Sequence, residues 1–181
     1  MVLGAVPSGC RRALDVGCGE GMLARRLRTL VPHVTGIDVD EPSLVLARGQ
    51  SGDVDYVLGD VLAAPFPAAS FDLVTSVAAL HHVDAAAALG RMRTLLRPGG
   101  TLAVVGLARG RSVRDVPAVV ATQMLRRRHG WWEPPSPTVW PPPLTYGEVR
   151  RVAEEVLPGC RFRRHLLWRW SLTWRVGTQA G

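Results

Sequence analysis

The sequence predicts an α/β protein with a doubly wound, mostly parallel, Rossmann-like sheet. Over the first 107 residues, short and nearly continuous apolar segments alternate with amphipathic ones. This pattern is typical of parallel strands that are covered by helices on both faces. A glycine-rich segment, VGCGEG at 16–21, follows the first apolar segment, where such sheets bind ligands. A chain of 181 residues, 47% of them hydrophobic, is expected to form one domain over 1–181.

The expected strands are short apolar segments that are bounded mostly by turn-forming residues. The third expected helix, over 85–96, has Asp84 at its N-cap, where a carboxylate accepts hydrogen bonds from free backbone N–H groups. The RPGG segment at 97–100 is expected to end that helix. The five expected strands span residues 12–17, 33–40, 54–58, 71–77 and 101–107.

The first two helices follow the first two strands. A helix over 20–30 would place Leu23, Leu27 and Leu30 on one apolar face. Asp40 is expected to cap the second helix, whose first turn holds a glutamate and a proline, both suited to a helix start.

A change of composition after residue 107 predicts a segment that covers the substrate. Residues 113–129 could form a helix, whereas 131–143 contain six prolines and cannot be regular. We assign 108–144 to this cover, because loops on a rigid scaffold often carry specificity. Its tryptophans could line an acceptor site or only cover the edge of the core: Trp131, Trp132 and Trp140.

The C-terminal part, 145–181, is expected to contain a helix and a pair of strands. Thr145 and Glu148 form a capping-box pattern for a helix that reaches about Leu157. Apolar residues at alternate positions predict strand over 162–176. The segment is too long for one ordinary strand, so we expect a bend or hairpin near 168–171.

The glycine loop differs from the loop that binds dinucleotides. Gly17, Gly19 and Gly21 occupy every second position, whereas the dinucleotide fingerprint is G-x-G-x-x-G. Asp15 and Glu20 would also repel a pyrophosphate at short range. These residues suit a cationic ligand instead, such as S-adenosylmethionine, which carries a sulfonium and an ammonium and no phosphate. A tight turn without a ligand is the alternative interpretation.

Acidic residues also end the second and third expected strands. Asp38 lies where an acid can accept hydrogen bonds from ribose hydroxyls, and Asp60 could accept from an adenine amino group beside the Val61 amide. Taken alone, an acid at the position of Asp38 is more often a solvated loop residue, and Asp60 is equally well explained as a loop cap. Cys18 and Val39, in the first two of these turns, complete the candidate cofactor contacts.

Four segments, taken in order, resemble the successive motifs of class I S-adenosylmethionine-dependent methyltransferases. Within that family, the most similar subgroup is the small-molecule type, which includes enzymes like the ubiquinone/menaquinone C-methyltransferases. The resemblance covers about residues 11–107. It implies a seven-stranded sheet with an antiparallel C-terminal hairpin, and cofactor contacts at Asp15, Gly17, Gly19, Asp38, Asp60 and Val61 and near Ser76. The segments are LDVGCGEG, VTGIDVD, LGDVLAAPFPAASFDLVTSVAALHHV and LRPGGTLAVVGL.

Methyl transfer from a sulfonium needs little more than an acceptor held in line and the exclusion of water. His81 and His82 follow the fourth strand, and we expect packing or hydrogen bonding for them rather than catalysis. We assign no catalytic residue. The family usually has a further helix before the first strand, where this chain has some ten residues, so we expect either a truncated start or a more open cofactor site.

Composition limits the other function classes. The net charge of +7 invites a nucleic-acid partner, but all 22 basic residues are arginine, which looks like a coding bias and weakens that interpretation. The resemblance to the small-molecule methyltransferases implies a small-molecule acceptor instead. An RNA or protein methyltransferase, an NAD-dependent oxidoreductase and a non-catalytic S-adenosylmethionine-binding module are the alternatives. Three scattered cysteines predict neither disulfides nor a metal site. Without a long apolar segment or a secretion signal, we expect a cytoplasmic protein.

Overall fold

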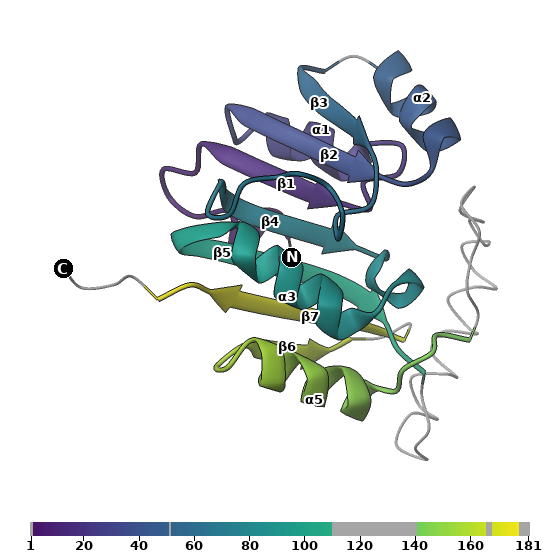
Figure 1. Ribbon diagram of the computed structural model, residues 1–181, viewed down its shortest axis with the longest axis vertical. Helices are drawn as coiled ribbons and strands as arrows, with labels where there is room; N and C mark the ends of the chain where they lie inside the picture. Colours follow the sequence, from purple (N-terminus) through teal and green to yellow (C-terminus); the bar gives the residue numbers. More distant parts are fainter. Residues whose placement is uncertain (1, 51, 110–140, 166–167, 178–181) are drawn as a thin grey trace.

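The computed structural model describes residues 2–50, 52–109, 141–165 and 168–177. It contains one seven-stranded sheet in the order β3-β2-β1-β4-β5-β7-β6 (Figure 1). The first five strands are parallel, and β7 lies antiparallel between β5 and β6. This confirms the predicted α/β fold and its antiparallel C-terminal hairpin.

The elements follow the predicted order. The strands are β1 Arg12–Val16, β2 His33–Asp38, β3 Val54–Leu58, β4 Phe71–Val77, β5 Leu96–Leu107, β6 Arg161–Arg164 and β7 Arg169–Arg175. The α-helices of the described ranges are α1 Met22–Arg28, α2 Glu41–Gly49, α3 Ala85–Leu95 and α5 Tyr146–Val156. Two short 3-10 turns are η1 Leu3–Ala5 and η2 Leu80–His82.

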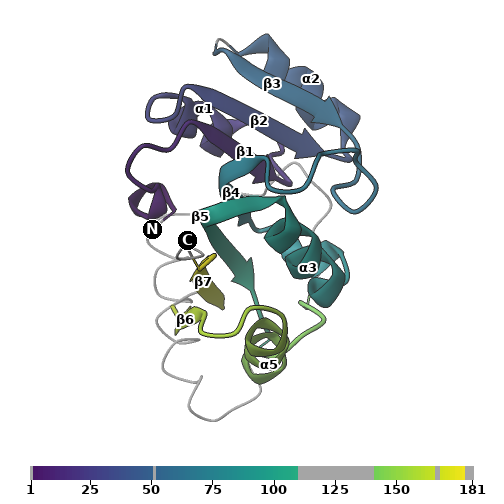
Figure 2. The ribbon, with the colours of Figure 1, turned by 60° about the vertical axis from the view of Figure 1, so that its left-hand side comes forward.

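Helices cover both faces of the sheet. Leu14 and Val74 point to the face where Leu89 of α3 packs, and α5 lies beside α3 there. Ala13, the neighbour of Leu14 in β1, points to the opposite face and packs with Leu27 of α1. Figures 1 and 2 show α3 and α5 on one side of the sheet and α1 on the other. Burial on both faces explains why the strands are continuously apolar.

The first helix is shorter than predicted. Gly21 has a φ of 74° and ends the glycine turn, so α1 begins only at Met22. It ends at Arg28, and Leu30 therefore lies beyond the helix with 55% of its surface exposed. The prediction that Leu30 belongs to the buried face was wrong, whereas Leu27 is fully buried.

The predicted helix caps are confirmed. Asp40 and Asp84 accept hydrogen bonds from amide groups of the first turns of α2 and α3, at 3.0 and 2.7 Å. Thr145 and Glu148 form the predicted capping box of α5. The strand β5, however, starts at Leu96, so the RPGG segment lies inside this strand and not between the helix and the strand. Its four residues bulge where β5 pairs irregularly with β4.

The C-terminal hairpin reverses direction earlier than predicted. The last residue of β6, Arg164, pairs with Trp170 of β7, so the turn precedes Arg169. Trp168 has a φ of 56°, a left-handed conformation that a turn needs and that usually belongs to glycine. Because a tryptophan supplies it here, the sequence contained no local signal for the turn.

Some predictions concern residues outside those that the structure describes. The expected helix over 113–129 and the three tryptophans of the predicted cover belong to this group. Among the described residues, no helix is long and apolar enough to cross a membrane. The same residues contain no group of three His, Cys, Asp or Glu side chains that could hold a metal ion.

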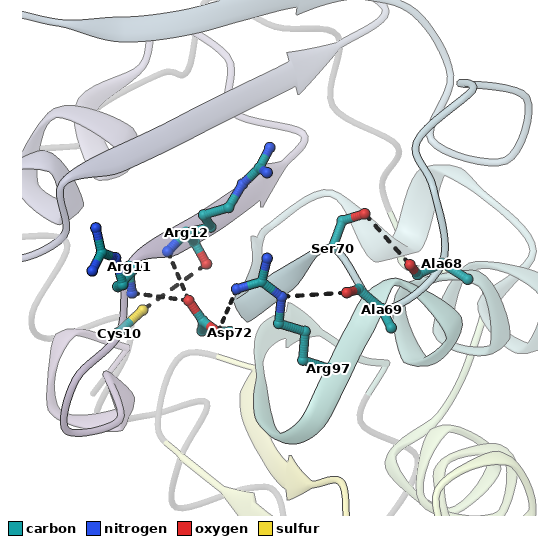
Figure 3. A network of polar contacts seen from close by, with 8 residues as sticks. All are labelled: Cys10, Arg11, Arg12, Ala68, Ala69, Ser70, Asp72 and Arg97. Atoms are coloured by element: carbon teal, nitrogen blue, oxygen red, sulfur yellow. Dashed lines mark hydrogen bonds and ion pairs between the residues drawn. The ribbon is translucent and has the colours of Figure 1, made fainter.

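Asp72 joins three strands at the amino end of the sheet (Figure 3). One of its carboxylate oxygens accepts hydrogen bonds from the backbone N–H groups of Arg11 and Arg12, at 2.9 and 2.8 Å. The other lies 3.2 Å from the Arg97 guanidinium. Burial alone would raise the pKa of Asp72, but these hydrogen bonds and the nearby positive charge lower it below its usual value. The network fastens the starts of β1, β4 and β5.

Gly106 provides a test of the packing between β5 and β7. A Cβ atom at this position would overlap the indole ring of Trp170, which is buried. Gly106→Ala should therefore reduce the free energy of unfolding by about 1–3 kcal/mol through overpacking. Urea denaturation followed by circular dichroism measures the change.

Gly147→Ala is the matched control. Gly147 lies in α5, and a Cβ there would meet no atom within 4 Å. Alanine favours helix over glycine by about 1 kcal/mol, so this variant should be as stable as the wild type or more stable. Equal urea midpoints for the two variants would contradict the described packing.

Candidate functional site

The predicted site residues meet at the carboxyl end of the sheet. The glycine loop follows β1, Asp38 ends β2, Asp60 follows β3, and Ser76 is the penultimate residue of β4. β1 lies between β2 and β4, where the order of the strands reverses. Open α/β sheets bind their ligands at this kind of position.

The amide groups of the three glycines and of Cys18 in the glycine loop are already hydrogen-bonded within the protein. The N–H groups of Gly17 and Cys18 donate to the Ile37 carbonyl, at 2.8 and 3.2 Å. The N–H group of Gly19 donates to the Asp38 carboxylate at 2.7 Å. A pyrophosphate site needs free N–H groups that point at the phosphate oxygens. Two acids, Asp15 of β1 and Asp38 of β2, instead adjoin the loop, and their charge favours a cationic ligand.

Glycine occupies the three positions of the loop for different structural reasons. A Cβ atom at Gly17 would overlap Ala79, and one at Gly21 would overlap the ring of Tyr56. A Cβ atom at Gly19 would meet no described atom within 4 Å. Gly17 and Gly21 are therefore needed for packing, whereas the open side of Gly19 leaves space for a ligand.

Asp38 connects the glycine loop to the end of β2. Its second carboxylate oxygen accepts a hydrogen bond from the Asp40 amide at 2.9 Å, so the side chain is held from two sides. A carboxylate has about four acceptor positions, so two backbone bonds leave capacity for ligand hydroxyls. Val39, the next residue, is 71% exposed on the rim of the site.

Asp15 is a buried acid next to the loop. Only 2% of its surface is exposed, and the Thr75 hydroxyl donates a hydrogen bond to it at 2.8 Å. Burial is the largest cause that raises its pKa, to about 7; the nearby charge of Asp38 adds to this, and the Thr75 bond acts in the opposite direction. A cation bound nearby would favour the ionised form of Asp15.

Asp60 behaves as a loop cap in this structure. Its side chain accepts a hydrogen bond from the Leu62 amide at 2.9 Å, and the adjacent Val61 is buried. Cys18 directs its thiol toward Gly36 of β2, where it also lies 3.8 Å from the Gly19 carbonyl oxygen. Ser76 is buried within β4. These four predicted residues, Asp60, Val61, Cys18 and Ser76, therefore lie near the rim of the site. The side chain of Cys18 is directed away from the rim.

Arg91 is a residue of this region that the sequence analysis missed. From α3 it donates hydrogen bonds to the carbonyl groups of Val61, Ala64 and Phe66, at 3.3, 2.8 and 3.0 Å. It thus holds the loop between β3 and β4 that carries the predicted adenine contacts. One arginine among 22 gave no signal in the sequence.

Two cavities lie at opposite ends of the sheet. The larger, of about 370 Å³, lies at the amino end beside Arg12, His33 and Phe71. The smaller, of about 160 Å³, lies near the carboxyl ends of β4 and β5, beside His81 and Leu107. We place the candidate site at the carboxyl end despite the larger cavity, because parallel sheets bind their ligands there and the acids and the glycine loop meet there.

Comparison with known families agrees with this geometry. Residues 14–104 match the family described as the methyltransferase domain. An uncharacterized methyltransferase of Mycobacterium bovis is 43% identical over 180 residues, which cover 94% of this chain and 90% of the relative. A demethylmenaquinone methyltransferase of Roseiflexus castenholzii is 32% identical over 165 residues, 82% of this chain and 69% of the relative. The chain belongs to the methyltransferase domain family.

Solved structures show the same fold. A phosphoethanolamine N-methyltransferase 2 of Haemonchus contortus, solved with S-adenosyl-L-methionine, has a TM-score of 0.68 at 17% identity and covers 98% of this chain and 51% of that one. The [4+2]-cyclase SpnF has a TM-score of 0.69 at 19% identity and covers 96% and 78%. Proteins with different reactions therefore share this architecture, and the chemistry depends on the site.

The raised pKa of Asp15 predicts a pH-dependent stability. Because the pKa lies above the value of 3.8 expected in the unfolded chain, the folded protein favours the protonated acid. The stabilisation that Asp15 contributes to the folded protein is fully present below about pH 4 and is lost as the pH rises through 7. Asp15→Asn should remove this loss, which amounts to roughly 4 kcal/mol at most.

Urea denaturation between pH 4 and pH 8 tests this prediction. The wild type should become less stable relative to Asp15→Asn across this range. Asp53→Asn, at an exposed carboxylate, should retain the wild-type slope. If Asp15→Asn retained it too, the buried acid would not be the group that titrates.

Proposed function

We propose that this protein transfers a methyl group from S-adenosylmethionine to a small-molecule acceptor. The observation that carries the proposal is the charge of the site: two acids, Asp15 and Asp38, adjoin a glycine loop whose three glycine amide groups are already bonded. A positively charged nucleoside suits this environment, whereas a dinucleotide would place phosphates beside both acids.

The residues of the site fit the cofactor. Asp38 would accept hydrogen bonds from the ribose hydroxyls, and the open side of Gly19 would admit the ligand close to the backbone. The charge of Asp15 would offset the positive charge of the ligand from below the loop. Asp60 and the Val61 amide would recognise adenine, while Cys18 and Val39 would contribute backbone and edge contacts, with Ser76 nearby.

S-adenosylmethionine supplies an activated methyl group on its sulfonium, so the protein needs to do little chemistry of its own. Its residues would hold the cofactor, orient the acceptor for in-line displacement and exclude water. We assign no catalytic base, because a base helps only when the acceptor atom arrives protonated.

Two observations support a small acceptor. The cavity near the carboxyl ends of β4 and β5, about 160 Å³, is large enough for one small ring, since an apolar cavity of about 150 Å³ can bind benzene. One relative is named a demethylmenaquinone methyltransferase and another a ubiquinone biosynthesis O-methyltransferase, names that indicate small acceptors for those proteins. We also expect a cytoplasmic location, in keeping with the free cysteines of the described chain.

Calorimetric titration with S-adenosylmethionine and with NAD tests the proposal. The first should bind and the second should not. Asp38→Ala should weaken S-adenosylmethionine binding by about 1–3 kcal/mol through lost hydrogen bonds. Asp53→Ala, at an exposed carboxylate, should leave the affinity unchanged. Binding of NAD, or an unchanged affinity in Asp38→Ala, would refute the assigned site.

A second experiment separates the acceptor classes. A panel of small hydroxylated aromatic acceptors and a transfer RNA are incubated with the protein, and S-adenosylhomocysteine is measured. We expect product with a small molecule. Product with RNA alone, together with a salt-dependent gel shift, would favour the RNA methyltransferase. No product in spite of cofactor binding would favour the non-catalytic module.

Arg91 is predicted to act on cofactor binding through the loop that it holds. Arg91→Ala should weaken the binding of S-adenosylmethionine and of adenosine by the same factor, about tenfold, because both present the adenine. Arg93→Ala is the matched control, since Arg93 of the same helix also donates to a carbonyl, that of Val156 at 2.9 Å, away from the loop. Equal effects of the two variants on affinity would show that Arg91 has only a general structural role.

A further inference from the structure

The larger cavity, of about 370 Å³ at the amino end of the sheet, runs across one face of the sheet. Its lining residues come mainly from β3, β2, β1, β4 and β5, which are consecutive in the sheet. Arg12 and Thr35 precede Leu14 and Ile37 by two positions in their strands, and side chains two positions apart point to the same face. The cavity therefore lies on the face of the sheet that carries α3.

The connection from β3 to β4 supplies no helix for this face. Parallel strands are usually joined through a helix. Because the strand order reverses at β1, the right-handed sense of such connections would place this helix on the face opposite α1. Residues 59–70, however, join β3 to β4 without a helix. Polar side chains of β2 and β3 therefore line a cavity where the helix of a usual connection would pack.

One end of the cavity, its arginine end, lies around Phe71 of β4. Arg11 and Arg12 come from the start of β1, and Arg97 comes from β5. The guanidinium group of Arg12 lies over the Phe71 ring, 5.8 Å from its centroid. Within the described ranges, the guanidinium groups of Arg11 and Arg12 have no hydrogen-bond or ion-pair partner. His33, which pairs with Arg12 in the register of β1 and β2, adds a further polar group.

Asp72 balances only one of these three arginines (Figure 3). One oxygen of its carboxylate lies 3.2 Å from the Arg97 guanidinium. The other oxygen accepts from the backbone N–H groups of Arg11 and Arg12 and not from their side chains. Arg97 also donates to the Ala69 carbonyl at 3.3 Å, but a guanidinium group has more N–H donors than these contacts use. Positive charge therefore remains in excess at the arginine end.

The opposite end of the cavity carries a hydroxyl group and an acid. Thr35 of β2 and Asp55 of β3 are partners in the register of the sheet, and both line the cavity. In the part of the chain that the structure describes, neither side chain has a hydrogen-bond partner. A carboxylate accepts hydrogen bonds and repels anions. Asp55 therefore suits hydroxyl groups of a ligand and keeps an anionic group at the arginine end.

These two ends together define the chemistry of a ligand. The planar fork of an arginine side chain matches the oxygens of a phosphate. A phosphate monoester carries about two negative charges near pH 7. That charge offsets the two guanidinium groups, of Arg11 and Arg12, that no acid of the described chain balances.

We propose that this cavity binds a small phosphate monoester with a hydroxylated body, of the sugar-phosphate class. Its phosphate accepts hydrogen bonds from the guanidinium groups of Arg12 and Arg97, and its hydroxyl groups donate to Asp55. The cavity volume of about 370 Å³ lies within the range of small-molecule sites, about 300–1,000 Å³. The cavity and the glycine loop lie at opposite ends of β1, so this inference does not depend on the proposed methyl transfer.

Calorimetric titration without the cofactor tests the site with three probes: ribose 5-phosphate, inorganic phosphate and ribose. Ribose 5-phosphate should bind most tightly, because it reaches both ends of the cavity. Inorganic phosphate should bind about tenfold more weakly, and ribose without a phosphate should show no measurable binding. Binding of ribose 5-phosphate should also weaken as the salt concentration rises, because salt screens exposed charges.

Two variants assign the ends of the ligand. Arg12→Gln should weaken the binding of ribose 5-phosphate and of inorganic phosphate by the same factor, about tenfold, because both present a phosphate to this side chain. Asp55→Ala should remove the advantage of ribose 5-phosphate over inorganic phosphate, because that advantage comes from the hydroxyl groups.

Arg26→Gln is the matched control for charge. Arg26 is exposed on α1, on the opposite face of the sheet, and it does not line the cavity. The variant loses the same charge as Arg12→Gln and should bind all three probes like the wild type. Equal losses of affinity in the two variants would mean that only the net charge of the protein attracts the phosphate.

Three other results would overturn the proposal. The first is an absence of ribose 5-phosphate binding to the folded wild type. The second is a single-stranded oligonucleotide that binds more tightly than ribose 5-phosphate and is lost in Arg12→Gln, which would assign the cavity to nucleic acid. The third is competition between ribose 5-phosphate and S-adenosylmethionine, which would place both in one site. Failure of S-adenosylmethionine to bind would refute only the proposed methyl transfer.

Discussion

The hydrogen bond between the Gly19 amide and the Asp38 carboxylate, 2.7 Å long, is the interaction on which the site depends. It joins the turn after β1 to the end of β2 and fixes the orientation of an acid at the rim. Together with the bonds from Gly17 and Cys18 to Ile37, it occupies three loop N–H groups that could otherwise bind a phosphate. This arrangement supports the proposal that the site takes a positively charged cofactor.

The same region shows how a binding site reduces stability. Asp15 is an acid inside the core, and burial makes its ionised form unfavourable, as its raised pKa shows. A neutral side chain would fold more easily there at neutral pH. Such a charge is typical of functional sites, because a bound cation compensates for it only when the ligand is present.

The proposed site divides between the two halves of the sheet. The ends of β1, β2 and β3 carry the groups assigned to the cofactor, and the region around β4, β5 and β7 carries the cavity that suits a small acceptor. α3 connects the halves: Arg91 near its middle holds the loop after β3, and its first residue, Ala85, lines the cavity. Movement of one helix would therefore affect both parts.

Local pattern was enough to determine the alternating strands, the caps at Asp40, Asp84 and Thr145, and the acids at the strand ends, because each depends on residues close in sequence. Tertiary structure decided what depends on distant contacts. The turn before Arg169 uses a positive φ at Trp168 that no glycine announces, and the glycines of the loop differ only in what packs against them. Arg12 and Arg97 lie far apart in the sequence and meet at one cavity because β4 pairs with both β1 and β5.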